Sequence, residues 1–161
     1  MNIDKRAKEL GLTLPPPMST QGLPFSTVVI DGSTAYISGH LPLNDEGKIF
    51  GPLGPVGETG DSIVTPEQAY ESARRVCIGI LASLQARLGS LERVDRWLKL
   101  LGFVNVAPGF KAIPPVVNGA SDLILELYGS LRGEHTRSAI GVAQLPFGAP
   151  VEIEAVVKVK P

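Results

Sequence analysis

The last regular segment of the chain, residues 151–159, has an apolar side chain at every second position and mostly charged side chains between them. The apolar positions are Val151, Ile153, Ala155, Val157 and Val159. Alternate side chains of a β-strand share a face, so the pattern predicts a strand with one buried and one polar face. The polar face carries Glu152, Glu154, Val156 and Lys158. This strand therefore belongs to a sheet that other elements cover on one side.

Two segments have the helical periodicity of such a covering layer. The sequence Thr-Pro-Glu-Gln at residues 65–68 is a strong helix start, because it combines a threonine cap, a proline at the first helical position and a capping-box glutamine. Apolar residues then recur at the spacing of one buried face until Gly89, which ends the helix. A second helix is predicted over Val116–Tyr128, ended by Gly129.

The remaining segments complete the expected order of elements. They are a short helix over residues 3–10, a proline-rich arm at 15–17, strands at 27–30 and 34–38, a glycine-rich surface loop at 42–64, and strands at 91–106 and 137–143. Asp31-Gly32-Ser33 joins the first two strands as a hairpin turn. This order predicts an α+β fold in which two main helices pack on one face of a mixed sheet. We expect one domain over residues 1–161, with residues 1–22 as an N-terminal extension.

Composition excludes several classes of function. Fifteen basic and sixteen acidic residues give a net charge of −1, which does not suit a protein that coats nucleic acid. Cys77 is the only cysteine, and with His40 and His135 it makes too few ligands for a structural zinc site. Residues 1–11 carry charges with no apolar signal core after them, and no segment is suited to cross a membrane. We expect a cytoplasmic protein without metal or organic cofactor.

Arg137 is the first candidate functional residue. It shares a strand face with Ala139, Gly141 and Ala143, whose small side chains leave room beside the guanidinium. The planar fork of an arginine can hold a carboxylate through two hydrogen bonds. The spacing alone leaves a second interpretation, in which Arg137 is an exposed residue at a strand end.

Glu152 and Glu154 are the second candidate pair. They are two residues apart on one strand face, so their Cα atoms lie roughly 6.5 Å from each other. Neighbouring carboxylates can perform acid–base chemistry. A polar strand face in solvent or at a subunit contact explains the same pattern. Ser38 and His40 also share a face, but no acid is positioned by sequence to orient the histidine of a serine hydrolase.

The C-terminal sequence resembles the signature of the Rid family of reactive intermediate (imine or enamine) deaminases, also called the L-PSP endoribonuclease family. The similar segments are TRSAIGVAQLP at residues 136–146 and VEIEA at 151–155. Weaker similarity is found in YISGHLP at residues 36–42 and in Val117-Asn118, which resembles the helix-starting asparagine of the family. The resemblance covers roughly residues 23–160.

The resemblance implies a chorismate-mutase-like fold and a homotrimer with clefts between subunits. It implies that Arg137 binds the substrate carboxylate and that Glu152 positions the hydrolytic water. Ser38, Gly39 and Asn118 would line or support the cleft. Two positions depart from the family pattern: Phe25 replaces a tyrosine that covers the substrate in many members, and Ala139 replaces a cysteine.

The expected function is the hydrolysis of 2-imino acids to 2-keto acids and ammonia. One alternative is a non-catalytic trimer that binds small carboxylates and acts by sensing or sequestration. The other is an endoribonuclease, as the family name suggests, although the near-neutral charge gives no support for a groove that follows a phosphate backbone.

Overall fold

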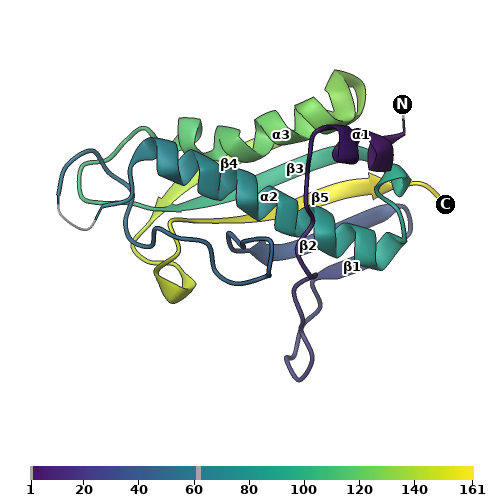
Figure 1. Cartoon of the computed structure of the whole chain (residues 1–161), viewed down its shortest axis with the longest axis horizontal. Coiled ribbons are helices and arrows are strands. Elements are labelled where there is room, and N and C mark those ends of the chain that lie inside the picture. Colours follow the sequence, from purple (N-terminus) through teal and green to yellow (C-terminus); the bar gives the residue numbers. More distant parts are fainter. Residues whose placement is uncertain (1, 61–62) are drawn as a thin grey trace.

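The sheet forms one layer of the molecule. The structure, a computed structural model, describes residues 2–60 and 63–161. Its strands are β1 (Val28–Asp31), β2 (Thr34–His40), β3 (Val94–Asn105), β4 (Thr136–Val142) and β5 (Val151–Val159). They lie in the order β1-β2-β5-β3-β4, and only β3 and β4 are parallel (Figure 1). The mixed sheet is therefore confirmed, with β4 at one edge.

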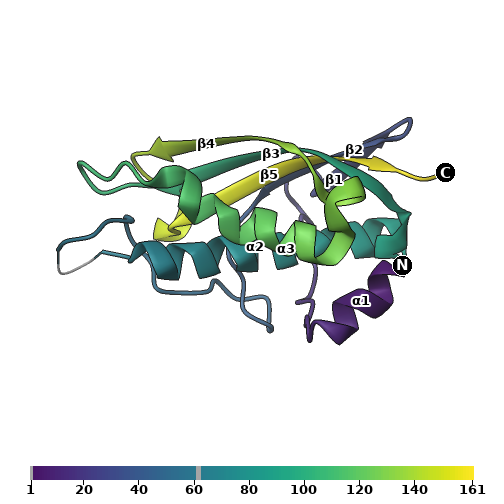
Figure 2. The same ribbon diagram turned by 90° about the horizontal axis from the view of Figure 1, so that it is seen from above.

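The two long helices, α2 (Pro66–Leu88) and α3 (Ile113–Gly133), lie side by side on the same face of this sheet (Figure 2). We call this the helix face, and the opposite side the open face. The alternation of β5 agrees with it, because its apolar positions are buried and its polar positions are not. The expected packing of two helices on one side of the sheet is confirmed.

A glycine permits the two helices to approach closely. A β-carbon at Gly119 of α3 would lie 2.0 Å from the carbonyl oxygen of Tyr70 in α2. No side chain can occupy that distance, so the backbone of α3 rests directly on the backbone of α2.

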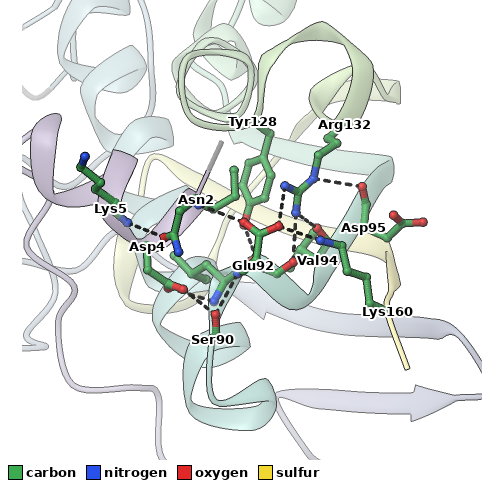
Figure 3. Close-up of polar contacts among 12 residues, drawn as sticks. Asn2, Asp4, Lys5, Ser90, Glu92, Val94, Asp95, Tyr128, Arg132 and Lys160 are labelled. Carbon is green, nitrogen blue, oxygen red and sulfur yellow. Dashed lines mark hydrogen bonds and ion pairs between the residues drawn. The ribbon is translucent and has the colours of Figure 1, made fainter.

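The N-terminal extension is anchored to the body of the protein. Its helix α1 (Ile3–Glu9) is capped by Asn2, whose side chain accepts from the backbone of Lys5, and Ile3 is fully buried. The backbone N–H of Ile3 donates to Glu92 at 3.0 Å (Figure 3). The expected short helix is confirmed, and its contacts with Glu92 and the core hold the N-terminal extension against the rest of the protein.

Glu92 is the centre of the polar cluster in Figure 3. It lies in the 3₁₀ turn η1 (Leu91–Arg93) and pairs with Arg132 of α3 at 3.1 Å and with Lys160 at 2.6 Å. The hydrogen bond from Lys160 is the main cause that holds the pKa of Glu92 down to about 2. The cluster joins the N-terminal extension, α3 and the C-terminal end of the chain.

Two sequence-based boundaries are corrected. The second helix begins at Ile113 rather than 116, because Pro114 and Pro115 fit its first turn, where no backbone N–H is needed. Gly129 ends its regular part as predicted, because its φ of 68° and ψ of 173° are not helical, and a further helical segment then runs to Gly133. The strand predicted at 91–106 begins at 94, after η1.

The loop at residues 42–64 is not wholly a surface feature. Val56 and Val64 are fully buried, and Val56 forms isolated bridges with Val64 and Val106. Residues 61 and 62 of this predicted loop lie outside the described residues. No helix in the described part of the chain has the length and apolar character needed to cross a membrane.

Candidate functional site

The candidate residues occupy both faces of the sheet. Arg137 and Ala139 of β4 are on the helix face, where Arg137 contacts α3 and Ala139 packs against the core. Glu152 of β5 is on the open face, because it alternates with the buried Val151 and Ile153. Within one chain the sheet therefore separates the Arg137 side chain from that of Glu152.

Arg137 is held in place by neutral groups. Its Nη1 donates to Oδ1 of Asn118 at 2.7 Å and to Oγ of Ser121 at 3.1 Å. Its Nη2 donates to the carbonyl oxygen of Pro114 at 3.3 Å. All three acceptors belong to α3, so the helix that covers β4 also orients the guanidinium. Asn118 is thus adjacent to Arg137, although it lies inside the helix and does not start it as predicted.

Two of the five guanidinium N–H groups remain for a ligand. Three are used by Asn118, Ser121 and Pro114, which leaves Nε–H and one N–H of Nη2. No acidic side chain in residues 2–60 or 63–161 forms an ion pair with Arg137. Arg137 does lie near the start of β4, as the alternative interpretation has it, but its side chain is half-buried rather than exposed. Its positive charge has no carboxylate partner among the described residues.

A cavity of about 410 Å³ lies beside the guanidinium. Its lining residues are Ser121, Leu125, Glu134, His135 and Arg137. The sequence predicted open space along the small residues of β4. Around Gly141 the side chains of Ile113 and Val106 fill that space, since a β-carbon at Gly141 would lie 3.0 Å from their atoms. The small residues therefore accommodate the start of α3, and the space next to Arg137 opens toward Ser121 and His135 instead.

Ser121 and His135 are site residues that the sequence analysis missed. Oγ of Ser121 lies 3.0 Å from Nε2 of His135, and Nδ1 of His135 lies 2.6 Å from the carbonyl oxygen of Gly133. Burial is the main cause that lowers the pKa of His135, and the nearby Arg137 lowers it further. The strand alternation could have found His135, because it lies two residues before Arg137. Ser121 gave no such signal, since only the packing of α3 brings it here.

Glu152 lies on the open face directly over Gly39 of β2. A β-carbon at Gly39 would come within 2.1 Å of Oε1 of Glu152, so the glycine makes room for the carboxylate. Burial raises the pKa of Glu152 above its usual value, and the neighbouring Glu154 raises it further. A half-buried carboxylate with a raised pKa suits a group that exchanges protons near neutral pH.

Ser38 precedes Gly39 in β2. Oγ of Ser38 donates to the carbonyl oxygen of Ser26 at 2.7 Å, which ties β2 to the segment that precedes β1. Phe25, in that segment, has a side chain that is 47% exposed. The structure thus places Ser38, Gly39 and Glu152 at one location and Arg137, Asn118 and Ala139 at another, and we call these two groups the half-sites.

The serine hydrolase interpretation is wrong. A bulge in β2 between Ile37 and His40 shifts the alternation, so His40 turns into the core while Ser38 does not. Nε2 of His40 lies 2.8 Å from Oγ of Ser83, and its Nδ1 bonds the carbonyl oxygen of Ser38. Burial lowers the pKa of His40. His40 is therefore a buried histidine whose ring bonds the Ser83 hydroxyl and the Ser38 backbone, and not the hydroxyl of Ser38.

The described residues contain no group of three or more His, Cys, Asp or Glu side chains that could hold a metal ion. Cys77 is buried in α2, as expected, and its burial raises the pKa of the thiol to about 12. Such a thiol is not a nucleophile at neutral pH.

Comparison with known proteins assigns the family. The sequence profile described as Endoribonuclease L-PSP matches residues 19–159. The chain belongs to the endoribonuclease L-PSP family. The resemblance noted in the sequence is confirmed, and the matched range includes every residue of both half-sites.

This member of the L-PSP family is similar to the following three proteins over most of its length. Protein TCP17 of Trypanosoma cruzi is 42% identical over 151 residues, which are 94% of this chain and 90% of that protein. Atu1372 of Agrobacterium tumefaciens, a protein of unknown function, is 40% identical with a TM-score of 0.84, covering 98% and 91% of the two chains. TdcF of Escherichia coli, solved with bound serine, is 20% identical with a TM-score of 0.60, covering 93% and 95%. The expected chorismate-mutase-like α+β fold is confirmed.

Proposed function

We propose that this protein hydrolyses 2-imino acids to 2-keto acids and ammonia, in clefts between the subunits of a homotrimer. The observation that carries the proposal is the state of Arg137. Its guanidinium is oriented by three neutral acceptors, lacks an acidic partner among the described residues and retains two N–H groups beside a cavity. Two such groups suit a carboxylate held by a bidentate contact.

The separation of the half-sites favours an oligomer. Arg137 is on the helix face of an edge strand, and Glu152 is on the open face. One chain cannot present both side chains to one small substrate. The open face also exposes Val29 (53%), Tyr36 (51%) and Ile140 (44%), and exposed apolar groups of this kind mark protein contacts. A neighbouring chain that packs there would bring its own Arg137 toward Glu152.

The proposed reaction begins with the substrate carboxylate on Arg137, which orients the C=N carbon. Glu152 of the adjoining subunit holds a water molecule and accepts one of its protons as the oxygen attacks that carbon. With a protonated imine as the substrate, the product of the attack is a neutral carbinolamine. Glu152 returns the proton to the nitrogen. The C–N bond then breaks as the hydroxyl oxygen forms the C=O bond and gives its proton to Glu152, and ammonia and the 2-keto acid leave.

A ligand of a relative supports a small substrate. The family member TdcF has been solved with serine, which carries a carboxylate and an adjacent nitrogen, and the cavity of about 410 Å³ beside Arg137 has room for such a molecule. 2-Aminoacrylate and 2-iminobutyrate have the same features. We therefore propose them as the first substrates to examine.

A coupled assay tests the proposal. A pyridoxal-phosphate dehydratase generates 2-iminobutyrate from threonine, and its decay to 2-oxobutyrate is followed with and without this protein. Acceleration that is lost in Arg137→Ala supports the deaminase. Binding of 2-oxobutyrate without acceleration of imine decay would contradict imine hydrolysis and support the carboxylate-binding alternative. Cleavage of RNA that depends on Arg137, again without acceleration of imine decay, would contradict it in favour of the endoribonuclease.

A further inference from the structure

Hydrogen-bond donors and acceptors near Arg137 form an ordered chain of four groups. The carbonyl oxygen of Gly133 can only accept, so Nδ1 of His135 carries the proton of their 2.6 Å contact. Nε2 of the neutral ring then has a free lone pair. At 3.0 Å it can only accept from the hydroxyl of Ser121.

The hydroxyl of Ser121 has one proton, which it donates in the hydrogen bond to Nε2 of His135. The oxygen of that hydroxyl is therefore left as an acceptor, and Nη1 of Arg137 donates to it at 3.1 Å. Each contact fixes the direction of the next one. If Nε2 of His135 were absent, the hydroxyl of Ser121 would be free to rotate, and its contact with Arg137 would no longer be directed.

We propose that His135 is a positioning residue of the carboxylate site, which acts through Ser121 to orient the guanidinium of Arg137. This inference rests on the proposed function, because it assigns Arg137 to the binding of a carboxylate. His135 touches neither the reacting carbon nor the attacking water in this account. Its side chain lines the cavity beside Arg137, so the positive charge of a protonated His135 ring would also attract a bound anion.

Charged groups lie around His135 and bear on how carboxylate binding depends on pH. Arg137 on β4 and Glu134 line the same cavity, and Lys99 of β3 lies opposite Thr136, next to His135. The two residues of α3 that line the cavity, Ser121 and Leu125, are neutral. The acidic residues Asp122 and Glu126 of α3 bond instead with Tyr70 and Arg74 of α2.

A proton on Nε2 of His135 would reverse its contact with Ser121. Oγ of Ser121 would then accept from both His135 and Arg137, and its own proton would be free to bond an anion in the cavity. The added positive charge would attract the anion as well. Carboxylate binding should therefore strengthen as pH falls through the pKa of His135, and by linkage the bound carboxylate should raise that pKa.

Two variants separate the two nitrogens of His135. In His135→Asn the amide nitrogen can replace Nδ1 toward Gly133, but no acceptor remains for Ser121. In His135→Gln the amide oxygen can replace Nε2 as that acceptor, but it cannot be protonated. The probe is 2-oxobutyrate, the stable product of the proposed reaction, with its dissociation constant measured by calorimetry between pH 5 and 8.

We expect His135→Asn to weaken 2-oxobutyrate binding about tenfold at pH 8, the effect of one directed hydrogen bond. His135→Gln should recover most of this affinity and lose the strengthening at low pH. Equal losses in the two variants, or unchanged binding in His135→Asn, would overturn the inference. If the wild type does not bind 2-oxobutyrate, or Arg137→Ala binds it equally well, the proposed function fails together with this inference.

A second measurement needs no variant. The chain has two histidines, so the ring protons of His135 and the buried His40 can be assigned by NMR and titrated. Saturating 2-oxobutyrate should raise the pKa of His135 and leave the signal of His40 unchanged. A pKa of His135 that does not move in the saturated protein would overturn the inference, while binding that depends on Arg137 would leave the proposed function standing.

Discussion

Oε1 of Glu152 lies where a side chain at position 39 would begin, because a β-carbon on Gly39 would be 2.1 Å from it. The obstructing atom is the end of a flexible side chain, so Gly39→Ala should fold and displace the carboxylate. We expect imine hydrolysis to fall about tenfold or more, as for a general base moved out of position, with 2-oxobutyrate binding retained. The coupled assay and calorimetry measure the two effects.

Gly79→Ala is the matched control for that substitution. A β-carbon at Gly79 of α2 would have no neighbour closer than 3.8 Å, which is an ordinary contact. The Gly79→Ala variant should hydrolyse imines at the rate of the wild type. Normal hydrolysis in Gly39→Ala would show that the position of the Glu152 carboxylate does not matter.

The pH dependence of hydrolysis should reflect the raised pKa of Glu152. Only the deprotonated carboxylate accepts a proton from water, so the rate should fall as pH decreases through this pKa, at a higher pH than for an ordinary glutamate. Glu154→Gln removes a neighbouring negative charge that raises the pKa of Glu152. The acid limb of the pH–rate profile should therefore move to lower pH in Glu154→Gln; a shift to higher pH would contradict the assignment.

Arg137→Lys keeps the positive charge of the carboxylate site but loses the planar fork. We expect the dissociation constant of 2-oxobutyrate to rise roughly ten- to a hundredfold, because an ammonium group cannot reproduce a bidentate contact. Calorimetry at constant ionic strength measures this change. Arg87→Lys, at an exposed position of α2, is the control and should bind as the wild type does. Equal affinities in all three proteins would remove Arg137 from the site.

Gly119→Ala tests the contact between the two helices. A β-carbon at this position would lie 2.0 Å from the carbonyl oxygen of Tyr70, a backbone atom that cannot move without shifting α2. We expect a loss of roughly 3 kcal/mol or more in the free energy of unfolding, at the upper end of overpacking effects. Urea denaturation measures this loss. A variant as stable as the wild type would mean that the helices are farther apart than the structure has them.

Glu92 should contribute to stability only above acidic pH. Its pKa of about 2 in the folded protein is below the ordinary value of 4.5, so the folded state favours the charged form. The contribution is fully present above about pH 4.5 and is lost as pH falls toward 2. Unfolding measured between pH 2 and 7 should show a weaker acid dependence in Glu92→Gln. Glu9→Gln, which removes an exposed carboxylate of α1, should leave that dependence unchanged.

The local signals in the sequence predicted the fold well. The capping box at Thr65 is formed by both of its hydrogen bonds, and the alternation of residues 151–159 correctly divided β5 between the core and the open face. Both features depend on residues that are close in the chain. The α+β order of elements followed from them, and so did the assignment of Arg137 and Glu152 to particular strand faces.

Features that depend on tertiary packing were missed. The bulge in β2 separates Ser38 from His40, and strict alternation does not reveal a bulge. The partners of Arg137 come from α3, sixteen or more residues away. The family resemblance named Asn118 for the cleft, but its contact with Arg137, and that of Ser121, depend on the approach of α3 to β4. The row of small residues on β4 was expected to border a pocket, yet it accommodates Ile113 and Val106.

Complementation between two inactive variants tests the central claim most directly. Arg137→Ala and Glu152→Gln are co-expressed with different tags, and oligomers that carry both tags are purified for the coupled imine-decay assay. If each cleft takes Arg137 from one chain and Glu152 from another, every mixed trimer should contain one intact cleft in three, and we expect about a third of the wild-type activity. Mixed oligomers no more active than either parent would contradict hydrolysis at a cleft that two chains complete.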